Sequence, residues 1–567
     1  MLGGIILENQ KFYNVREHIE NAIKEHPDNI AFKIKEKDGK KIKYKNITYK
    51  KMQKDIFALG TAINNMVKGE KRVAIIGKNS YSWALTYLAT LYGNNIVVPL
   101  DKGLPDCEIK DLIKRSKANI VVFEDTYAEI MNEMKEEKWG NLKHYICMTK
   151  KDKFKTLDQA IEDGKKQMKK GDKKIKGTKI DNKKMAAIIF TSGTTSLAKG
   201  VMLSQYNIAT NLNSLQNVIT IYDNDVNMAF LPFHHTFGST GLMLFLSKGA
   251  TNVFCDGLRH IQKNLEEYKV SIFVCVPLLL EAMYKKIMQE VKKQNKEKTV
   301  KFGVKLTKFL LKFKIDIRRK VFKEIIGKLG GNLRYVVSGA SAIDRKVAEG
   351  FNNFGIITVQ GYGLTETSPV LTAETESTIR YGSIGHAIPE VEIKIEDKNE
   401  EGIGEIVAKG PNVMLGYYEN EEETNKVLKD GWFYTGDLAY QDKDGYIFIA
   451  GRKKNVIVLK NGKNVYPEEI EILISNLPYV AECMVFGKEK DDDLIVSAKI
   501  VYNKEYVEEN YKDKSQDELK EMIWQDIKEI NKDLTTYKHI KHLIVTDEPM
   551  VKTSTAKVKR YEEIKNT

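Results

Sequence analysis

Short apolar runs alternate with helix-length amphipathic stretches along the N-terminal part of the chain. The runs at residues 72–77 and 94–100 consist mainly of aliphatic residues, over a length typical of buried strands. Residues 79–93, which lie between them, carry apolar side chains at helical spacing, and Asn79 or Ser80 is a candidate N-cap. This alternation predicts an α/β domain in which the strands are mostly parallel.

The same alternation returns in the middle of the chain and then changes. Further apolar strands are predicted at 185–190, 270–277 and 333–340. From about Gly382 the strands become short, with Gly/Asp turns, and from Gly451 the chain is charged and of α+β character. The predicted fold class is α/β, with a large N-terminal domain of α/β subdomains with parallel-rich sheets plus a small β subdomain. A smaller α+β C-terminal domain follows.

Composition limits the class of protein. A chain of 567 residues, 42% hydrophobic and 30% charged, can bury several cores, which excludes a disordered or collagen-like chain. No apolar run reaches the ~18 residues of a membrane span, and the first residues lack the basic start of a signal peptide, so we expect a cytoplasmic protein. The five scattered cysteines are expected to be reduced core residues, without zinc or disulfides.

The net charge of +14 is concentrated in two segments. Residues 292–328 hold fourteen Lys/Arg and three acidic residues, and residues 165–184 hold ten Lys and two acidic residues. The second segment is expected to be an exposed connection. Neither segment has the interleaved aromatics of a nucleic-acid module, so no nucleic-acid partner is predicted. Such basic patches attract anionic lipid or phosphate-rich ligands alike.

A loop rich in hydroxyl groups follows the apolar strand at 185–190. It offers backbone N–H groups, hydroxyls and one cation to a phosphate chain, through Thr191, Ser192, Gly193, Thr194, Thr195 and Lys199. The loop ends in Ala-Lys-Gly, whereas a Walker loop ends in Gly-Lys-Ser/Thr, so a P-loop kinase or GTPase is a poor fit. The alternative is a solvated Ser/Gly turn.

This loop resembles the TSGTTGxPKG signature of the adenylate-forming superfamily of acyl-CoA synthetases, adenylation domains and luciferases. It departs from that signature at Ser196 and Ala198, where the family usually has Gly and Pro. Further family motifs follow in the expected order, and the resemblance extends almost to the C-terminus. It implies that the loop binds the phosphates of ATP and that Thr194 helps to bind Mg²⁺.

The middle motifs resemble the family's acyl and adenine sites. In "LPFHHTFG", His235 has the position that borders the acyl carboxylate, and the His-His form is associated with fatty-acid-activating members. In "VSGASAI", Gly339 and Ala340 let the backbone approach the purine. The alternative for a single histidine is a hydrogen-bonded core residue.

The motif "QGYGLTETSP" at 360–369 resembles the family's most diagnostic stretch. The resemblance implies that Gln360, Gly361 and Tyr362 form the adenine site, with Tyr362 stacked on the base. Thr365 would contact the α-phosphate, and Glu366 would bind Mg²⁺, a cation that prefers oxygen ligands. As a bare string, the motif is also compatible with a strand-ending turn.

The C-terminal motifs imply a second set of site residues. Asp437 and Arg452 resemble the ribose ligands, and Lys454 has the hinge position. The predicted domains are therefore 1–450 for ATP and acyl binding, 451–454 as the hinge and 455–567 as a mobile lid. In "PMVKTSTAKVKR", Lys557 aligns with the catalytic lysine, although the preceding glycine is Ala556 here.

The resemblance implies a two-step ligase that uses ATP, Mg²⁺ and CoA. A carboxylic acid, with a long-chain fatty acid favoured, is activated to acyl-AMP with release of pyrophosphate and is then transferred to CoA with release of AMP. Two alternatives stay open: transfer to an acyl-carrier protein by a synthetase or free-standing adenylation enzyme, and a membrane-associated regulatory relative that binds ATP without turnover. The oligomeric state is not predicted.

Apolar residues spaced by three or four within 292–328 form an amphipathic helix pattern with a cationic flank. They are Phe302, Leu306, Leu310, Phe313, Ile317, Val321 and Ile325. Such a helix suits an anionic membrane surface, which predicts peripheral contact at the inner membrane surface and favours a long-chain substrate. The alternative is a surface helix docked on the core.

Overall fold

The computed structural model describes residues 10–38, 41–149, 153–191, 198–460, 462–490, 493–552 and 558–565. Within these residues the chain divides into two compact units. Unit 1 contains the chain up to Thr191, Ala198–Glu392 and Ala408–Phe433. Unit 2 contains Ile393–Val407 and the chain from Tyr434 onward.

One sheet of unit 1 is built around parallel strands, with antiparallel β8–β9 and β9–β19 pairs at one end. In spatial order its strands are β19 (Gly416–Tyr417), β9 (Lys199–Ser204), β8 (Met185–Thr191), β4 (Ile96–Leu100), β3 (Arg72–Ile76), β5 (Ile120–Phe123), β6 (His144–Cys147) and β7 (Lys155–Thr156).

A second sheet of unit 1 is parallel from β14 to β1 and antiparallel at both edges. Its order is β16 (His386–Ala387), β15 (Val370–Ala373), β14 (Ile357–Gly363), β13 (Tyr335–Ser338), β12 (Ile272–Cys275), β10 (Val226–Ala229), β11 (Thr251–Phe254), β1 (Ile30–Asp38) and β2 (Lys41–Thr48). The parallel-rich sheets predicted from the sequence are therefore confirmed.

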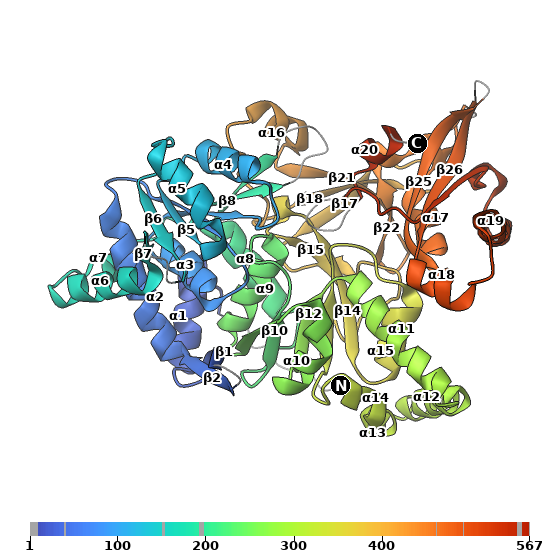
Figure 1. Ribbon diagram of the computed structural model, residues 1–567, viewed down its shortest axis with the longest axis horizontal. Coiled ribbons are helices and arrows are strands. Elements are labelled where there is room, and N and C mark those ends of the chain that lie inside the picture. Colours follow the sequence, from blue (N-terminus) through green and yellow to red (C-terminus); the bar gives the residue numbers. More distant parts are fainter. Residues whose placement is uncertain are drawn as a thin grey trace. The chain divides into compact units, whose positions relative to one another are not determined.

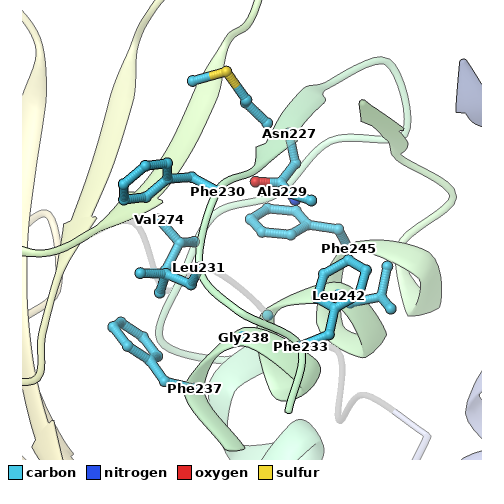
Figure 2. Close-up of a pocket in the computed structure, with 12 residues that line it drawn as sticks. Asn227, Ala229, Phe230, Leu231, Phe233, Phe237, Gly238, Leu242, Phe245 and Val274 are labelled. Atoms are coloured by element: carbon cyan, nitrogen blue, oxygen red, sulfur yellow. The ribbon is translucent and has the colours of Figure 1, made fainter. Parts of the chain in front are cut away.

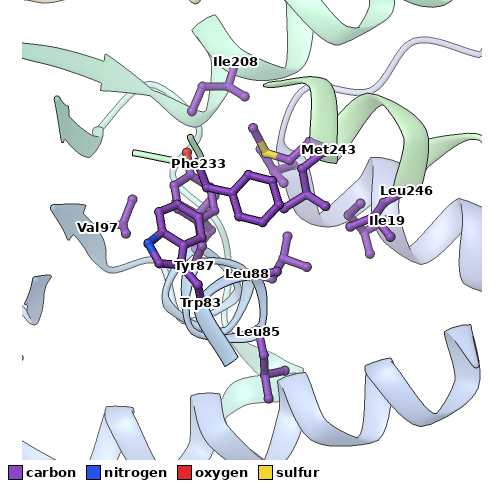
Figure 3. Packing of buried hydrophobic residues seen from close by; sticks show 14 of the residues in the cluster. Ile19, Trp83, Leu85, Tyr87, Leu88, Val97, Ile208, Phe233, Met243 and Leu246 are labelled. Atoms are coloured by element: carbon purple, nitrogen blue, oxygen red, sulfur yellow. The ribbon is translucent and has the colours of Figure 1, made fainter. Parts of the chain in front are cut away.

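A central layer of helices packs with one face of each sheet. Figure 1 shows α8 and α9 between the two sets of strands, and Figure 3 shows Trp83 beside Phe233 in this core. Successive side chains of a strand point to opposite faces of its sheet. In β3, therefore, Val73 packs in this central core, whereas its neighbour Ala74 packs in the core on the other face. The helices are α1 (Val15–Glu25), α2 (Tyr49–Met66), α3 (Tyr81–Tyr92), α8 (Gln205–Gln216) and α9 (Thr236–Ser247).

Other helices cover the outer faces of the two sheets. The first sheet is covered by α4 (Asp106–Arg115) and α5 (Ala128–Glu136). The second sheet is covered by α10 (Ile261–Glu267), α11 (Pro277–Lys293), α14 (Lys323–Lys328) and α15 (Arg345–Asn353). Unit 1 is thus built of α and β layers that leave the carboxyl ends of the parallel strands available for a site.

The two lysine-rich segments differ from the sequence prediction. Part of 165–184 is helical, since it includes the end of α6 (Leu157–Lys169) and all of α7 (Lys174–Gly177). These helices bury Ile161 and Ile175 in the core. The single amphipathic helix expected over 292–328 is divided into the end of α11, α12 (Glu297–Leu311), α13 (Arg318–Val321) and α14.

The cysteine prediction is correct in part. The cysteines are free thiols, and Cys147 and Cys275 are buried, but Cys107 is exposed on α4, so it is not a core residue. In the part of the chain that the structure describes, no helix has both the length and the apolar character needed to cross a membrane.

Unit 2 contains the predicted small β subdomain and the α+β region. The β subdomain consists of β17 (Glu392–Glu396), β18 (Gly404–Lys409), β21 (Trp432–Gln441) and β22 (Ile447–Arg452). The short β20 (Leu428–Lys429) and α16 (Glu421–Val427) precede β21 and belong to the unit 1 segment Ala408–Phe433. The α+β region consists of a β25–β26–β27 sheet and a β23–β24 pair, with α17 and α19 packed on the sheet. Their bounds are β23 (Ile457–Val458), β24 (Asn464–Val465), α17 (Pro467–Ser475), β25 (Val480–Lys490), β26 (Asp493–Tyr502), α18 (Lys504–Asn510), α19 (Gln516–Lys532), β27 (His542–Thr546) and α20 (Arg560–Lys565).

Candidate active site

The most diagnostic motif lies at the carboxyl end of β14. Gln360, Gly361 and Tyr362 belong to the strand, and Thr365 and Glu366 lie in the short 3₁₀ turn that follows it. The buried Gln360 side chain accepts a hydrogen bond from the Ile343 N–H at 2.8 Å and donates one to the Ser383 carbonyl at 2.9 Å. These bonds fix the strand end relative to its neighbours, so the motif forms a defined structure rather than a solvated turn.

Gly339 and Ala340 follow β13, the strand next to β14. A Cβ atom on Gly339 would lie 2.9 Å from Cζ of Phe237, so the Phe237 ring packs closely on this glycine. Two of the predicted motifs therefore meet here. Ala340 has a φ of 72°, a left-handed conformation that costs a non-glycine residue roughly 1–2 kcal/mol. Strained backbone of this kind clusters at functional sites.

Tyr417 connects Glu366 to Lys199. The Tyr417 hydroxyl donates a hydrogen bond of 2.8 Å to Oε1 of Glu366, and Nζ of Lys199 lies 5.1 Å from the centroid of the Tyr417 ring. Burial and the Glu366 carboxylate raise the pKa of Tyr417, so its proton is retained for this bond. Lys199 also pairs with Glu423, whose pKa falls to about 2 because Lys199 and Lys426 donate hydrogen bonds to it.

Buried amide side chains hold the segment that follows Glu366. Asn412 donates to the carbonyls of Thr367 at 2.8 Å and Val370 at 3.0 Å, and Asn211 of α8 donates to the Val370 carbonyl at 2.8 Å. Because buried backbone groups must be paired, these amides fix the turn that presents Glu366. Sequence reasoning missed Tyr417, Asn211 and Asn412.

The hydroxyl-rich loop is described only at its two ends. Thr191 ends β8, and its hydroxyl donates a hydrogen bond of 3.4 Å to the carbonyl of Lys199, which begins β9. The Ala198 carbonyl accepts a hydrogen bond of 2.7 Å from the Arg115 guanidinium. Ser192, Gly193, Thr194 and Thr195 lie outside the described residues, so their predicted phosphate and metal contacts stay predictions.

His235 is the N-cap of α9 and lies beside a second histidine and a carboxylate. The ring centroids of His234 and His235 are 4.2 Å apart, and Nε2 of His234 is 3.3 Å from Oδ1 of Asp101, the residue after β4. The ligand atoms of Asp101, His234 and His235 all lie within 4.8 Å of one another, a set that could hold a divalent cation. No sequence signal pointed to Asp101.

A small apolar pocket, with a cavity volume of about 10 Å³, is lined by residues that include some on either side of this histidine pair in the sequence. Figure 2 shows Phe230, Phe237, Leu242 and Phe245 around it, with Asn227 as its polar member. The pocket is smaller than the ~300–1,000 Å³ of typical ligand sites. The cavity has room for about one water-sized group, so an acyl group requires the side chains that line it to move.

The buried carboxyl of Glu374 supports β14 from the neighbouring strand end. Its oxygens accept hydrogen bonds from the backbone N–H groups of Gln360 at 2.9 Å and Arg380 at 2.7 Å. Burial raises the pKa of Glu374 to about 7, against the two backbone N–H groups, which lower it. A titratable group of this kind next to a candidate site was not found from the sequence.

Asp437 and Arg452 face each other on β21 and β22 of unit 2. Nε of Arg452 lies 2.8 Å from Oδ1 of the buried Asp437, so the two candidate ribose ligands lie together. The neighbouring Lys453 pairs with Glu405 at 2.7 Å, and Glu405 also accepts from the N–H of Gly436. Lys454 is exposed in the turn that follows β22. Its predicted role as the hinge, and the domain limits at 450 and 455, stay predictions.

Lys557 lies outside the described residues, but the ends of its loop are well anchored in unit 2. Lys552 forms a β-bridge with Val558, and the N–H of Lys559 donates to the Val551 carbonyl at 2.8 Å. Nη2 of Arg560 donates to both carboxylate oxygens of Glu471 of α17, at 2.6 and 2.5 Å, and Nη1 donates to the Val485 carbonyl. Burial raises the pKa of Glu471, and the Arg560 guanidinium opposes that shift.

The structure thus assembles the predicted residues in two separate groups. Unit 1 brings together Lys199, Glu366 and the β14 motif, and it places Gly339 against Phe237 near His235. Unit 2 brings together Asp437 and Arg452.

The fold of this chain is similar to that of solved acid–CoA ligases. The solved structure of an anthranilate CoA ligase in complex with anthranoyl-AMP has a TM-score of 0.76, with 18% sequence identity and 98% of both chains covered. The molecule therefore has the fold of an adenylate-forming enzyme.

The family follows from the sequence. A model described as "AMP-binding enzyme" matches residues 19–418, and one described as "AMP-binding enzyme C-terminal domain" matches residues 454–566. The first match covers more than half of the chain, so this protein belongs to the AMP-binding enzyme family.

Curated relatives extend over most of the chain at low identity. Fatty acyl-CoA synthetase B of Dictyostelium discoideum is 26% identical over 531 residues, which cover 86% of this chain and 77% of the relative. A chloroplastic long-chain-fatty-acid–[acyl-carrier-protein] ligase of Arabidopsis thaliana is 24% identical, over 91% of this chain and 80% of the relative.

Proposed function

We propose that this protein activates a carboxylic acid with ATP and transfers the acyl group to CoA, and that the acid is a long-chain fatty acid. The observation that carries the proposal is the Glu366–Tyr417–Lys199 assembly at the end of β14. A carboxylate that follows a parallel strand, with a fixed hydroxyl and a cation beside it, suits a metal–triphosphate complex.

In the first step, a carboxylate oxygen of the acid attacks the α-phosphorus of ATP. A new O–P bond forms while the bond from that phosphorus to the bridging oxygen breaks, and pyrophosphate leaves. Both reactants are anions, so the site must supply positive charge and hydrogen-bond donors. We assign this task to Lys199, Thr365 and Lys557, with His235 beside the acid.

The remaining assignments concern the nucleotide and the metal. Gln360, Gly361, Tyr362, Gly339 and Ala340 would bind adenine, while Asp437 and Arg452 would bind the ribose. Glu366, fixed by Tyr417, and Thr194 would hold Mg²⁺, and the Glu366 oxygens are ligands that this ion prefers. When bound, the ion neutralises phosphate charge.

In the second step, the sulfur of CoA attacks the acyl carbonyl carbon, the thiol loses its proton, and AMP leaves. Lys557 is not needed for this step, so we propose that a hinge at Lys454 moves the C-terminal domain between the steps. Such a movement fits an enzyme that uses one site for two reactions.

Support for a long acyl chain comes from the relatives named fatty acyl-CoA synthetase and long-chain-fatty-acid ligase. The apolar lining of the pocket beside His235 agrees with an aliphatic substrate. The relative named for acyl-carrier protein favours a second candidate, in which the acceptor is the thiol of a carrier protein.

The test measures acid-dependent ATP–pyrophosphate exchange with acids from acetate to oleate, followed by a thioester assay with CoA. We expect exchange to peak with long acids and a CoA thioester to form. Exchange without a CoA product favours the carrier-protein acceptor. An absence of exchange with every acid contradicts an adenylating enzyme and favours a regulatory relative that binds ATP.

A further inference from the structure

Helix α12 has apolar residues on two of its faces, and one of these faces is docked on the core. Val300 and Val304 pack against the cluster of buried residues that covers the second sheet, and Thr307 is buried beside them. Gly303 lies against the next segment, where an added Cβ would be 3.1 Å from Val321. The alternative raised from the sequence, a helix docked on the core, therefore accounts for this inner face alone.

The outer face of α12 carries a stripe of large apolar side chains. Phe302, Leu306 and Phe309, together with Phe313 two residues after the helix, are spaced by four, three and four residues, which places them along one line. Their exposed fractions are 67%, 38%, 56% and 62%. The rings of Phe309 and Phe313 are 5.2 Å apart in an edge-to-face arrangement. A contiguous exposed apolar stripe is typical of an interaction surface.

A row of exposed lysines lies along one flank of the aromatic stripe, as helical spacing requires. Lys298, Lys301, Lys305 and Lys312 are all exposed, and no carboxylate of the described residues lies within 4 Å of their ammonium groups. Lys308, in the same row, pairs with Glu349 at 2.7 Å. The surface therefore combines apolar side chains with uncompensated positive charge.

The partner of such a surface must be apolar in its interior and anionic at its edge. An anionic lipid bilayer has both properties, because its acyl region accepts the aromatic side chains while its headgroups attract the lysines. A symmetric pairing with a second copy would place one lysine row near another, which like-charge repulsion disfavours. We propose that the outer face of α12 binds the surface of an anionic membrane.

The inference is independent of the proposed function, because it concerns a surface that contains none of the candidate active-site residues. The experiment uses the full chain in a flotation assay with phosphatidylcholine vesicles prepared with and without phosphatidylglycerol. We expect binding to the anionic vesicles alone, and weaker binding as ionic strength rises through the range where the Debye length shortens from about 30 to about 3 Å.

Variants test the two parts of the surface separately. We expect F302S/F309S/F313S to reduce binding to anionic vesicles at least tenfold. For K298E/K301E/K305E/K312E, we expect the affinity for anionic vesicles to fall roughly fivefold per lysine removed. This is the contribution that a basic residue near the surface makes to binding an anionic membrane. The matched controls are L258S, another strongly exposed apolar residue, and K166E/K169E/K173E in the other lysine-rich segment. Both controls should bind as the unaltered chain does.

Three outcomes would overturn the proposal: no flotation of the unaltered chain with anionic vesicles, an equal loss in the controls, or undiminished flotation of both α12 variants. A change of oligomeric state in F302S/F309S/F313S, with vesicle binding unchanged, would instead assign the stripe to a second copy. ATP–pyrophosphate exchange in the absence of lipid should be unchanged in every variant, which separates a failure here from a failure of the proposed function.

Discussion

At the scale of single residues, Tyr417 has the most connections within the candidate site. Its hydroxyl fixes the Glu366 carboxylate, its ring faces the Lys199 ammonium, and its backbone lies in the strand that pairs with β9. A residue that contacts both a candidate metal ligand and a candidate phosphate ligand sets the distance between them. Positioning of this kind contributes to catalysis only while the geometry is fixed.

We therefore expect Y417F to lower kcat/KM for ATP in the exchange assay. A hydrogen bond to a charged group contributes about 1.5–3 kcal/mol, which corresponds to a loss of roughly tenfold to a hundredfold. The matched control is Y49F, which removes another buried tyrosine hydroxyl, bonded at 2.8 Å to the Ala250 carbonyl in the core. Equal kcat/KM values for the two variants would contradict the role of Tyr417.

Glu374 makes stability depend on pH. Its pKa is raised by burial from 4.5 to about 7 in the folded chain, so between these values the folded state holds a proton that the unfolded state has lost. The free energy of unfolding therefore decreases as pH rises through this range, by up to about 3 kcal/mol. Urea unfolding across this range should show the slope in the unaltered chain and a flatter dependence in E374Q. The neighbouring exposed residue provides the control E376Q, and an unchanged slope in E374Q would rule out this origin.

At the scale of elements, the short helix α20 anchors the loop that contains Lys557. Arg560 begins this helix and contacts both α17 and β25, and Glu563 accepts hydrogen bonds from Lys499 of β26 and from the N–H of Val551, each at 2.7 Å. The loop is therefore attached to the unit 2 core at both of its ends.

We expect R560A to reduce the free energy of unfolding by about 3 kcal/mol or more. The substitution leaves the Glu471 carboxylate buried without its partner, which costs more than the pair itself contributes. Denaturant unfolding measures the change. The control is K559A, which removes an exposed pair with Glu562 and should cost less than about 1 kcal/mol. If the two variants unfold alike, the anchor is not at Arg560.

At the scale of the whole molecule, the sequence predicted those parts of the fold that local patterns determine. The run at 72–77 became β3, and Ser80 caps α3 by accepting from the Trp83 N–H at 3.2 Å, because apolar runs and caps are local features. The motif at 360–369 lies at the end of β14, the strand-ending position with which its bare string is also compatible.

The missed features depend on contacts between residues far apart in the sequence. Asp101, which follows β4 of the first sheet, meets His234, which precedes α9, and Asn211 of α8 meets Val370 of β15 in the second sheet. The sequence also did not determine which way the α12 aromatic side chains point. An apolar stripe at helical spacing is compatible with packing on the core and with contact to a membrane. Packing of Val300 and Val304 decides which face turns inward.

The division of the chain into units has a consequence for cutting and rejoining it. In the described part of the chain from Ala198 onward, the polypeptide passes from one unit to the other at 392–393, 407–408 and 433–434. A single break before Tyr434 would release most of unit 2 but leave residues 393–407, which include β17 from its second residue and the start of β18, on the other fragment. Two polypeptides made this way would each carry part of the sheet that contains β17, β18, β21 and β22, so a single cut does not separate the two units.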